Sequence, residues 1–193
     1  MEMNQTAAAS GNLTFASGSL TLVDFSIAGT REEGDPISFS KTFGAGLTVP
    51  FSSSTIGDLD YDIPQGVYTS LEIEFNTSSG SNSLVVLGSY TNSSAQTFPL
   101  RFEFWSSESF AIEGEDGSGT GKISIEKNTN PISAIQLDPN YWFQPISIAA
   151  LDGASIVNIS GTPTLLITEN DNESIYDLIA DRIDQSLEAT FSL

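Results

Sequence analysis

The stretch VYTSLEIEF at residues 67–75 decides the fold class of this chain. In it Leu71, Ile73 and Phe75 alternate with two glutamates, and a period of two is the pattern of a β-strand with one face on the core and one in water. The stretch FPLRFEF at residues 98–104 repeats this alternation. The short polar connection before it predicts a β-hairpin with the apolar strand that begins at Leu84.

Strand patterns continue on both sides of this hairpin, and they predict about ten strands in all. One helix is expected at residues 171–188, where Ile175 and Ile179 recur on one face and where Asn170 with Glu173 resembles a capping box. Apolar faces of strands must be buried against another layer. We therefore predict a mainly β protein, an antiparallel two-sheet β-sandwich of jelly-roll type with one C-terminal α-helix. Residues 1–11 are expected to be a flexible N-terminal arm and residues 12–193 a single domain.

The composition excludes several classes of function. Twenty-five acidic residues against six basic ones give a formal net charge of −19, which disfavours nucleic acid and anionic membranes as partners. The chain contains no histidine and no cysteine, so the commonest general base and the best nucleophile are missing, and we expect no enzyme. No apolar run is long enough to span a bilayer. We expect an extracellular or cell-surface protein whose export signal has been removed.

One acidic stretch is a candidate metal site. Asp58, Asp60 and Asp62 place three carboxylates at alternate positions, a spacing that Ca²⁺ can use. The stretch is not an EF-hand loop, because Ile63 stands where a glycine is needed and Thr69 where the closing glutamate is needed. The alternative is a solvated acidic turn. No cofactor is expected other than Ca²⁺.

Three aromatic residues are candidates for ligand binding. Trp105, Tyr141 and Trp142 could form a platform on which sugar rings stack, because aromatic faces bind the apolar surfaces of sugars. The alternative is core packing, which is favoured for Trp142 because Phe143 follows it. The alternation of its strand predicts that Trp105 points outward.

Four stretches together resemble uncharacterised β-rich surface lipoproteins of Bacteroidetes-type bacteria. They are IPQGVY at residues 63–68, FPLRFEF at 98–104, DPNYWF at 138–143 and NESIYDLI at 172–179. The resemblance covers about residues 13 to 190 and implies export and a non-catalytic sandwich. The chain departs from that pattern in lacking the lipid-bearing cysteine. A second likeness, in LTFASGSLTL at residues 13–22, is to TasA-like biofilm fibre subunits, whose jelly rolls polymerise by lending an N-terminal strand.

These observations lead to a hypothesis and an alternative. The hypothesis is a non-catalytic extracellular structural or adhesive protein, in which an assembly strand containing Leu13 and Phe15 is added to a neighbouring sheet. Its partners would be further copies of the chain or other surface proteins. The alternative is a surface module that binds carbohydrate or calcium.

Overall fold

The computed structural model describes residues 2–5, 9–10, 12–51, 56–80, 83–116, 122–129 and 131–192, and it describes side chains from residue 12 to residue 191. The protein is mainly β, with 55% of its residues in strands and 14% in helices. No helix of the described part is both long and apolar enough to cross a membrane.

The elements follow one another along the chain without a repeat. The strands are β1 (Glu2–Gln5), β2 (Ala9–Ser10), β3 (Leu13–Arg31), β4 (Ile37–Pro50), β5 (Gly66–Thr77), β6 (Leu84–Thr91), β7 (Thr97–Phe104), β8 (Ser109–Asp116), β9 (Ile123–Ile125), β10 (Ile132–Leu137), β11 (Ile156–Ile159), β12 (Thr162–Ile167) and β13 (Glu188–Ser192). The helices are α1 (Pro139–Phe143), α2 (Ile148–Asp152) and α3 (Glu173–Ala180), with short 3₁₀ turns at Gly57–Leu59 and Asp184–Ser186.

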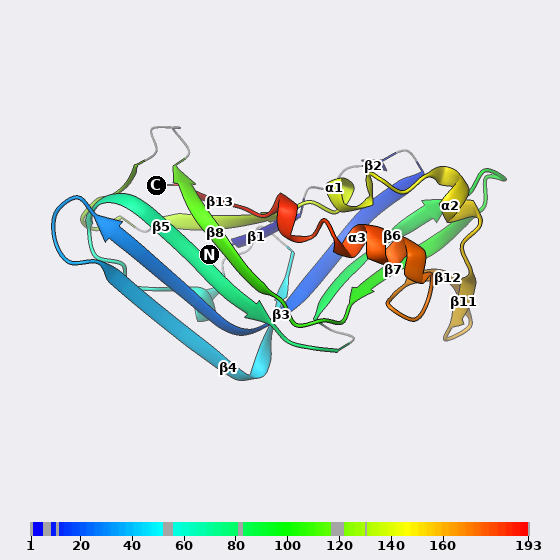
Figure 1. Cartoon of the computed structure of the whole chain (residues 1–193), viewed down its shortest axis with the longest axis horizontal. Coiled ribbons are helices and arrows are strands. Elements are labelled where there is room, and N and C mark those ends of the chain that lie inside the picture. The colour runs from blue at the N-terminus through cyan, green and yellow to red at the C-terminus, as the bar shows by residue number, and fades with distance from the viewer. Residues whose placement is uncertain are drawn as a thin grey trace.

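The long strand β3 runs through both halves of an elongated molecule (Figure 1). Its first part, Leu13–Leu20, pairs with β6, and its second part, Leu22–Arg31, pairs with β5. Each half of the sheet then continues with its own strand: β7 pairs with β6 in the first half, and β8 pairs with β5 in the second. The predicted hairpin is confirmed, since β6 and β7 pair antiparallel up to Thr91 opposite Thr97.

Helices cover the sheet in the half that contains β6, β7, β12 and β11 (Figure 1). Aromatic contacts join the two layers: the ring centroid of Phe143 in α1 lies 4.9 Å from that of Phe15 and 5.8 Å from that of Phe102. The ring of Tyr176 in α3 lies 6.0 Å from Phe104. This half is therefore built from a sheet and a helical layer rather than from two sheets.

The other half is closed by curvature of the sheet. Strands β13, β8 and β5 stand between β10 and β3 in the strand order, yet Ile27 of β3 and Ser133 of β10 line the same pocket. The inward row Leu71, Ile73 and Phe75 of β5 is almost fully buried here, as the alternation of residues 67–75 predicts.

Four features differ from the sequence prediction, the first being that the described residues contain three helices where one was expected. The strands form one sheet. It is mixed, because three pairs of strands are parallel: β1 with β10, β12 with β7, and β13 with β8.

The last helix ends at Ala180 instead of 188, because the chain turns there and enters β13 between β10 and β8. Asn172, in a left-handed conformation with φ 57°, precedes α3, and its side chain bonds the backbone of Ser155 and Leu166 instead of forming a cap. The capping box predicted at Asn170 is therefore wrong.

Candidate functional site

The N-terminal strand β1 occupies one end of the sheet. Its four residues pair in parallel with β10, from Glu2 opposite Ala134 to Gln5 opposite Leu137. The other edge of β10 is taken by β13, and β1 is the last strand of the sheet at this end. An uncovered edge would present unpaired N–H and C=O groups, so β1 protects the backbone of β10. Residues 1, 6–8 and 11 of the expected arm lie outside the described residues.

The predicted assembly residues Leu13 and Phe15 belong to the core of their own chain. They are 4% and 2% exposed, and Leu13 pairs with Tyr90 of β6 on one edge and with Ser10 of β2 on the other. Lending this strand to a neighbour would empty the core from which it came. Both described N-terminal strands lie at the periphery, but β1 forms four residue pairs with a strand distant in sequence and β2 forms two with the neighbouring β3, so β1 is the better candidate for exchange.

The acidic loop is organised by a lysine. The ammonium group of Lys41 donates hydrogen bonds of 2.8 and 2.7 Å to the backbone carbonyls of Asp58 and Asp60, and it lies 4.7 Å from the ring centroid of Tyr61. The carboxylate-bearing residues Asp58, Asp60 and Asp62 are exposed. No group of three or more acidic side chains in the described part of the chain could hold a metal ion. The ammonium group of a lysine in β4 thus holds the backbone of this loop.

The two aromatic candidates in α1 make internal contacts. Trp142 is fully buried and its Nε1 donates a 2.5 Å hydrogen bond to Ser186, so neither face of its indole is open to a sugar. The guanidinium carbon of Arg182 lies 3.9 Å from the ring centroid of Tyr141 and covers one face of that ring. These contacts fix α1 against the segment that follows α3.

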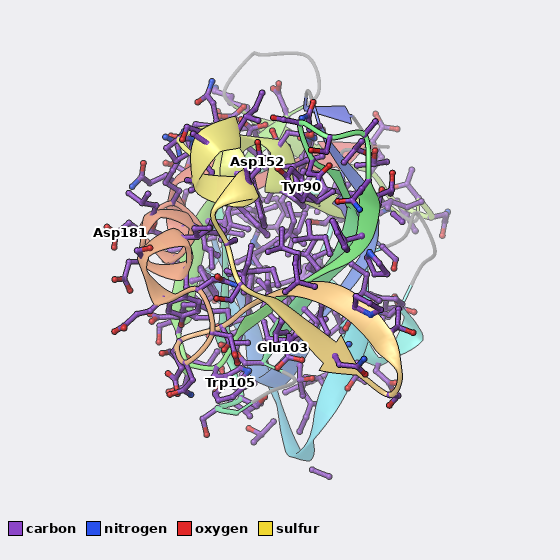
Figure 2. The ribbon with its side chains drawn as sticks, turned by 90° about the vertical axis from the view of Figure 1, so that its right-hand side faces the viewer. Tyr90, Glu103, Trp105, Asp152 and Asp181 are labelled. Atoms are coloured by element: carbon purple, nitrogen blue, oxygen red, sulfur yellow. The ribbon has the colours of Figure 1, made fainter. Side chains whose placement is uncertain are left out.

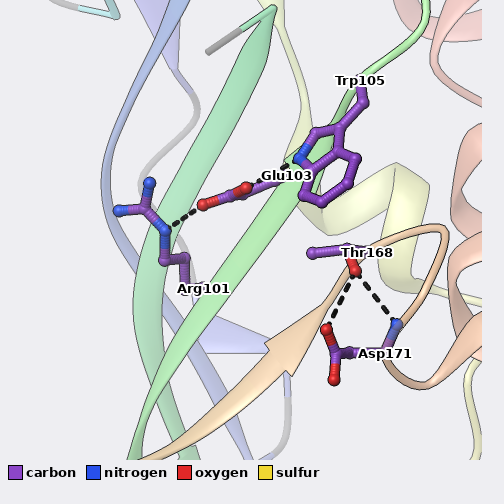
Figure 3. A network of polar contacts seen from close by, with 5 residues as sticks. All are labelled: Arg101, Glu103, Trp105, Thr168 and Asp171. Atoms are coloured by element: carbon purple, nitrogen blue, oxygen red, sulfur yellow. Dashed lines mark hydrogen bonds and ion pairs between the residues drawn. The ribbon is translucent and has the colours of Figure 1, made fainter. Parts of the chain in front are cut away.

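Trp105 directly follows β7, and its side chain lies beside that of Glu103 (Figure 2). Its Nε1 donates a 2.7 Å hydrogen bond to Oε2 of Glu103, while Nε of Arg101 pairs with Oε1 (Figure 3). Spacing of two residues places all three side chains on one face of the strand. Glu103 is only 7% exposed, and donors two residues before and two residues after it stabilise its buried carboxylate. Alternation predicts the face of these residues but not the burial of Glu103.

Near these side chains, a buried threonine shapes the turn between β12 and α3 (Figure 3). Thr168 is fully buried, and its Oγ1 accepts hydrogen bonds from the backbone N–H groups of Asn170 and Asp171 at 3.1 and 3.0 Å. The same hydroxyl donates to Oδ2 of Asp171 at 3.3 Å. The acidic stretch at residues 169–172 is thus organised as a turn that leads into α3.

A pocket of about 770 Å³ opens between the acidic loop and the connection from β9 to β10. Asp60 and Asp62 lie on its border, and Ile27, Ser133 and Phe191 line it from three different strands. These residues are far apart in the sequence, and no local motif marks them. Sequence reasoning therefore identified two border residues and missed the pocket.

Comparisons with models of protein families, with curated proteins and with solved structures found no match to this chain. The two resemblances described from the sequence stay predictions.

Proposed function

We propose that this protein is a non-catalytic structural subunit of an extracellular assembly, in which β1 of one copy pairs with β10 of the next. The observation that carries the proposal is the position of β1, a peripheral N-terminal strand that covers a sheet edge through four parallel residue pairs.

Exchange of this strand conserves its contacts. Pairing with β10 uses backbone hydrogen bonds, so a strand from a neighbour makes the same bonds as the chain's own strand. The free energy difference between the closed and exchanged forms is consequently small. The fraction of exchanged copies rises with protein concentration, because the chain's own tethered strand competes at a high effective concentration. Head-to-tail exchange uses two different surfaces of each copy, and such contacts extend into filaments when they do not close into a ring.

The remaining core supports such a subunit. Strand β3 crosses both halves and pairs with β5 and β6, and these strands pair with β8 and β7, so the ladders of the body do not use β1. A copy that donates β1 therefore keeps its folded body. We also propose that the curved half approaches the predicted sandwich, with β10 and β13 facing β3 and β4. The likeness of residues 13–22 to TasA-like fibre subunits points toward the same class of function.

The net charge of −19 sets a condition for assembly. Copies of like charge repel one another, and salt screens that repulsion over about 8 Å at physiological ionic strength. We expect high-mass species to increase with both protein concentration and ionic strength. The extracellular location is part of the proposal and rests on the polar, strand-rich composition.

The test alters the backbone of β1 without changing the body. Asn4→Pro removes an N–H group from β1 and fixes φ, and both changes disfavour a strand ladder. Asn4→Ala keeps the N–H group and leaves φ free, so it is the matched control. Sedimentation and electron microscopy should show filaments for the unmodified chain and for Asn4→Ala, and dispersed particles for Asn4→Pro. Equal assembly of the two variants, or no assembly of the unmodified chain at any concentration, would refute the proposal.

A further inference from the structure

The pocket beside the acidic loop has an apolar floor. Ile27 of β3, Leu59 of the loop, Ile125 of β9 and Phe191 of β13 line it and are each at least nine-tenths buried. Its volume of about 770 Å³ lies within the range of about 300–1,000 Å³ that is usual for small-molecule sites. A ligand with one aromatic or aliphatic ring system fits this space.

A buried hydroxyl in the wall of the pocket lacks a partner. Ser133 is 7% exposed, and its Oγ has no hydrogen-bond partner within the described residues. The residue lies directly opposite Phe191 in the β10–β13 ladder, in the buried row of β10 that includes Ile135. Buried polar groups are nearly always paired, so this position is suited to a ligand that can donate or accept a hydrogen bond.

The border of the pocket is acidic. Asp60, Asp62 and Glu126 contribute carboxylates there, Lys127 contributes one ammonium group, and the ammonium group of Lys41 is bonded to the carbonyl of Asp60 beside them. The four border residues are all exposed. An excess of carboxylates around a concave site attracts cations and repels anions, and the strongly negative chain raises the local concentration of cations further.

We propose that this pocket binds a small organic cation. The apolar body of the ligand lies against Ile27 and Phe191, a polar atom of the ligand pairs with Ser133, and its positive charge faces the carboxylates of Asp62 and Glu126. This site is independent of the β1 exchange described above, because β1 pairs with Ala134–Leu137 and the pocket lies at the other end of β10.

Three indole compounds that differ chiefly in charge test the class of ligand. Tryptamine is cationic, tryptophol is neutral and indole-3-propionate is anionic at pH 7. Calorimetric titration should give binding of tryptamine roughly threefold tighter than that of tryptophol, as expected for a solvent-screened ion pair, and no binding of the anion. The preference should fall at high salt. Absence of binding by all three compounds, or equal binding of all three, would overturn the proposal.

Two variants locate the binding in this pocket. Ser133→Leu fills the wall, and Glu126→Lys reverses a charge on an exposed position, so the fold does not depend on the second change. Tryptamine binding should be lost in the first variant and should fall to that of tryptophol in the second. Ser124→Ala, on β9 but outside the pocket lining, is the control and should bind as the unmodified chain does. Unchanged tryptamine binding in Glu126→Lys would contradict the assignment even if Ser133→Leu failed to fold.

Discussion

The hydroxyl of Tyr90 in β6 donates a hydrogen bond to Oδ1 of Asp152, the last residue of α2, across 62 positions of the chain (Figure 2). The backbone N–H and the Oγ of Ser93 donate to the same carboxylate at 3.1 and 2.5 Å. One aspartate thereby ties the helical layer to the hairpin of β6 and β7. Figure 2 places this contact at the opposite end of the view from Glu103 and Trp105.

Protonation of Asp152 should make the protein less stable at acidic pH. Hydrogen bonds from Ser93 and Tyr90 lower the pKa of the Asp152 carboxyl below its usual value of 3.8. A lowered folded-state pKa means that the contribution is fully present above about pH 4 and is lost as pH falls through the folded pKa. Asp152→Asn should melt at a lower temperature than the unmodified chain at pH 7, with a smaller difference at pH 3. Thermal melts at the two pH values measure this, and a constant difference would contradict it.

Gly88 permits a close approach of β3 to β6. A Cβ atom there would lie 2.0 Å from the carbonyl oxygen of Thr14, next to the irregularity between Phe15 and Ser17. Gly88→Ala should reduce the free energy of unfolding by about 1–3 kcal/mol, the cost of overpacking. Gly44→Ala is the matched control, because nothing lies within 4 Å of a Cβ at Gly44. Urea titrations compare the two, and equal stability would show that the β3–β6 contact is misplaced.

Trp142 is expected to act in stability rather than in sugar binding. Replacement of a fully buried tryptophan by alanine costs about 3–5 kcal/mol, and the indole of Trp142 is 0% exposed. Trp105→Phe keeps an aromatic ring and removes one of the two donors to Glu103, which should cost about 1–3 kcal/mol because Oε2 of the buried carboxylate loses its hydrogen bond. Chemical denaturation measures both. A Trp142→Ala protein of unchanged stability would return Trp142 to the list of surface candidates.

Ionisation of Tyr61 should make the protein less stable at alkaline pH. Its hydroxyl donates a 2.9 Å hydrogen bond to the carbonyl of Phe25, and burial raises the pKa of Tyr61 from 10.0 to about 12. A raised folded-state pKa means that the contribution is intact below pH 10 and is lost as pH rises toward 12. Tyr61→Phe should be less stable by about 1 kcal/mol at pH 8 and should lose less stability between pH 10 and 12. Circular dichroism during denaturation at each pH checks this, and parallel profiles would argue against it.

Local pattern predicts the strands of this protein well and their neighbours poorly. The alternation at residues 67–75 gives the correct buried face of β5, and a short connection gives the β6–β7 hairpin. Parallel pairing of β13 with β8 or of β12 with β7 joins segments distant in sequence, and no local signal encodes it.

The candidate site shows the same division. Strand signals identify Leu13 and Phe15 as strand residues, but only the three-dimensional packing shows that they fill their own core. The small polar composition of residues 1–11 predicts an arm, whereas the pairing of Glu2–Gln5 with β10 depends on the edge that β10 presents. Ser133 carries no sequence signal at all, because its significance comes from its burial without a partner.

The most direct test of strand exchange is disulfide trapping between copies. Asn4 lies opposite Gln136, adjacent strands are about 5 Å apart, and this separation suits a disulfide between engineered cysteines. The chain has no cysteine of its own, so Asn4→Cys and Gln136→Cys proteins of different tag length can be mixed under assembly conditions and oxidised. Thr91→Cys with Thr97→Cys, opposite each other in the β6–β7 hairpin, is the intramolecular control. We expect a disulfide-linked product that carries both tags and, when both cysteines are in one chain, a ladder of multimers. Cross-linking confined to single chains of the double variant, with no product from the mixture, would contradict the account.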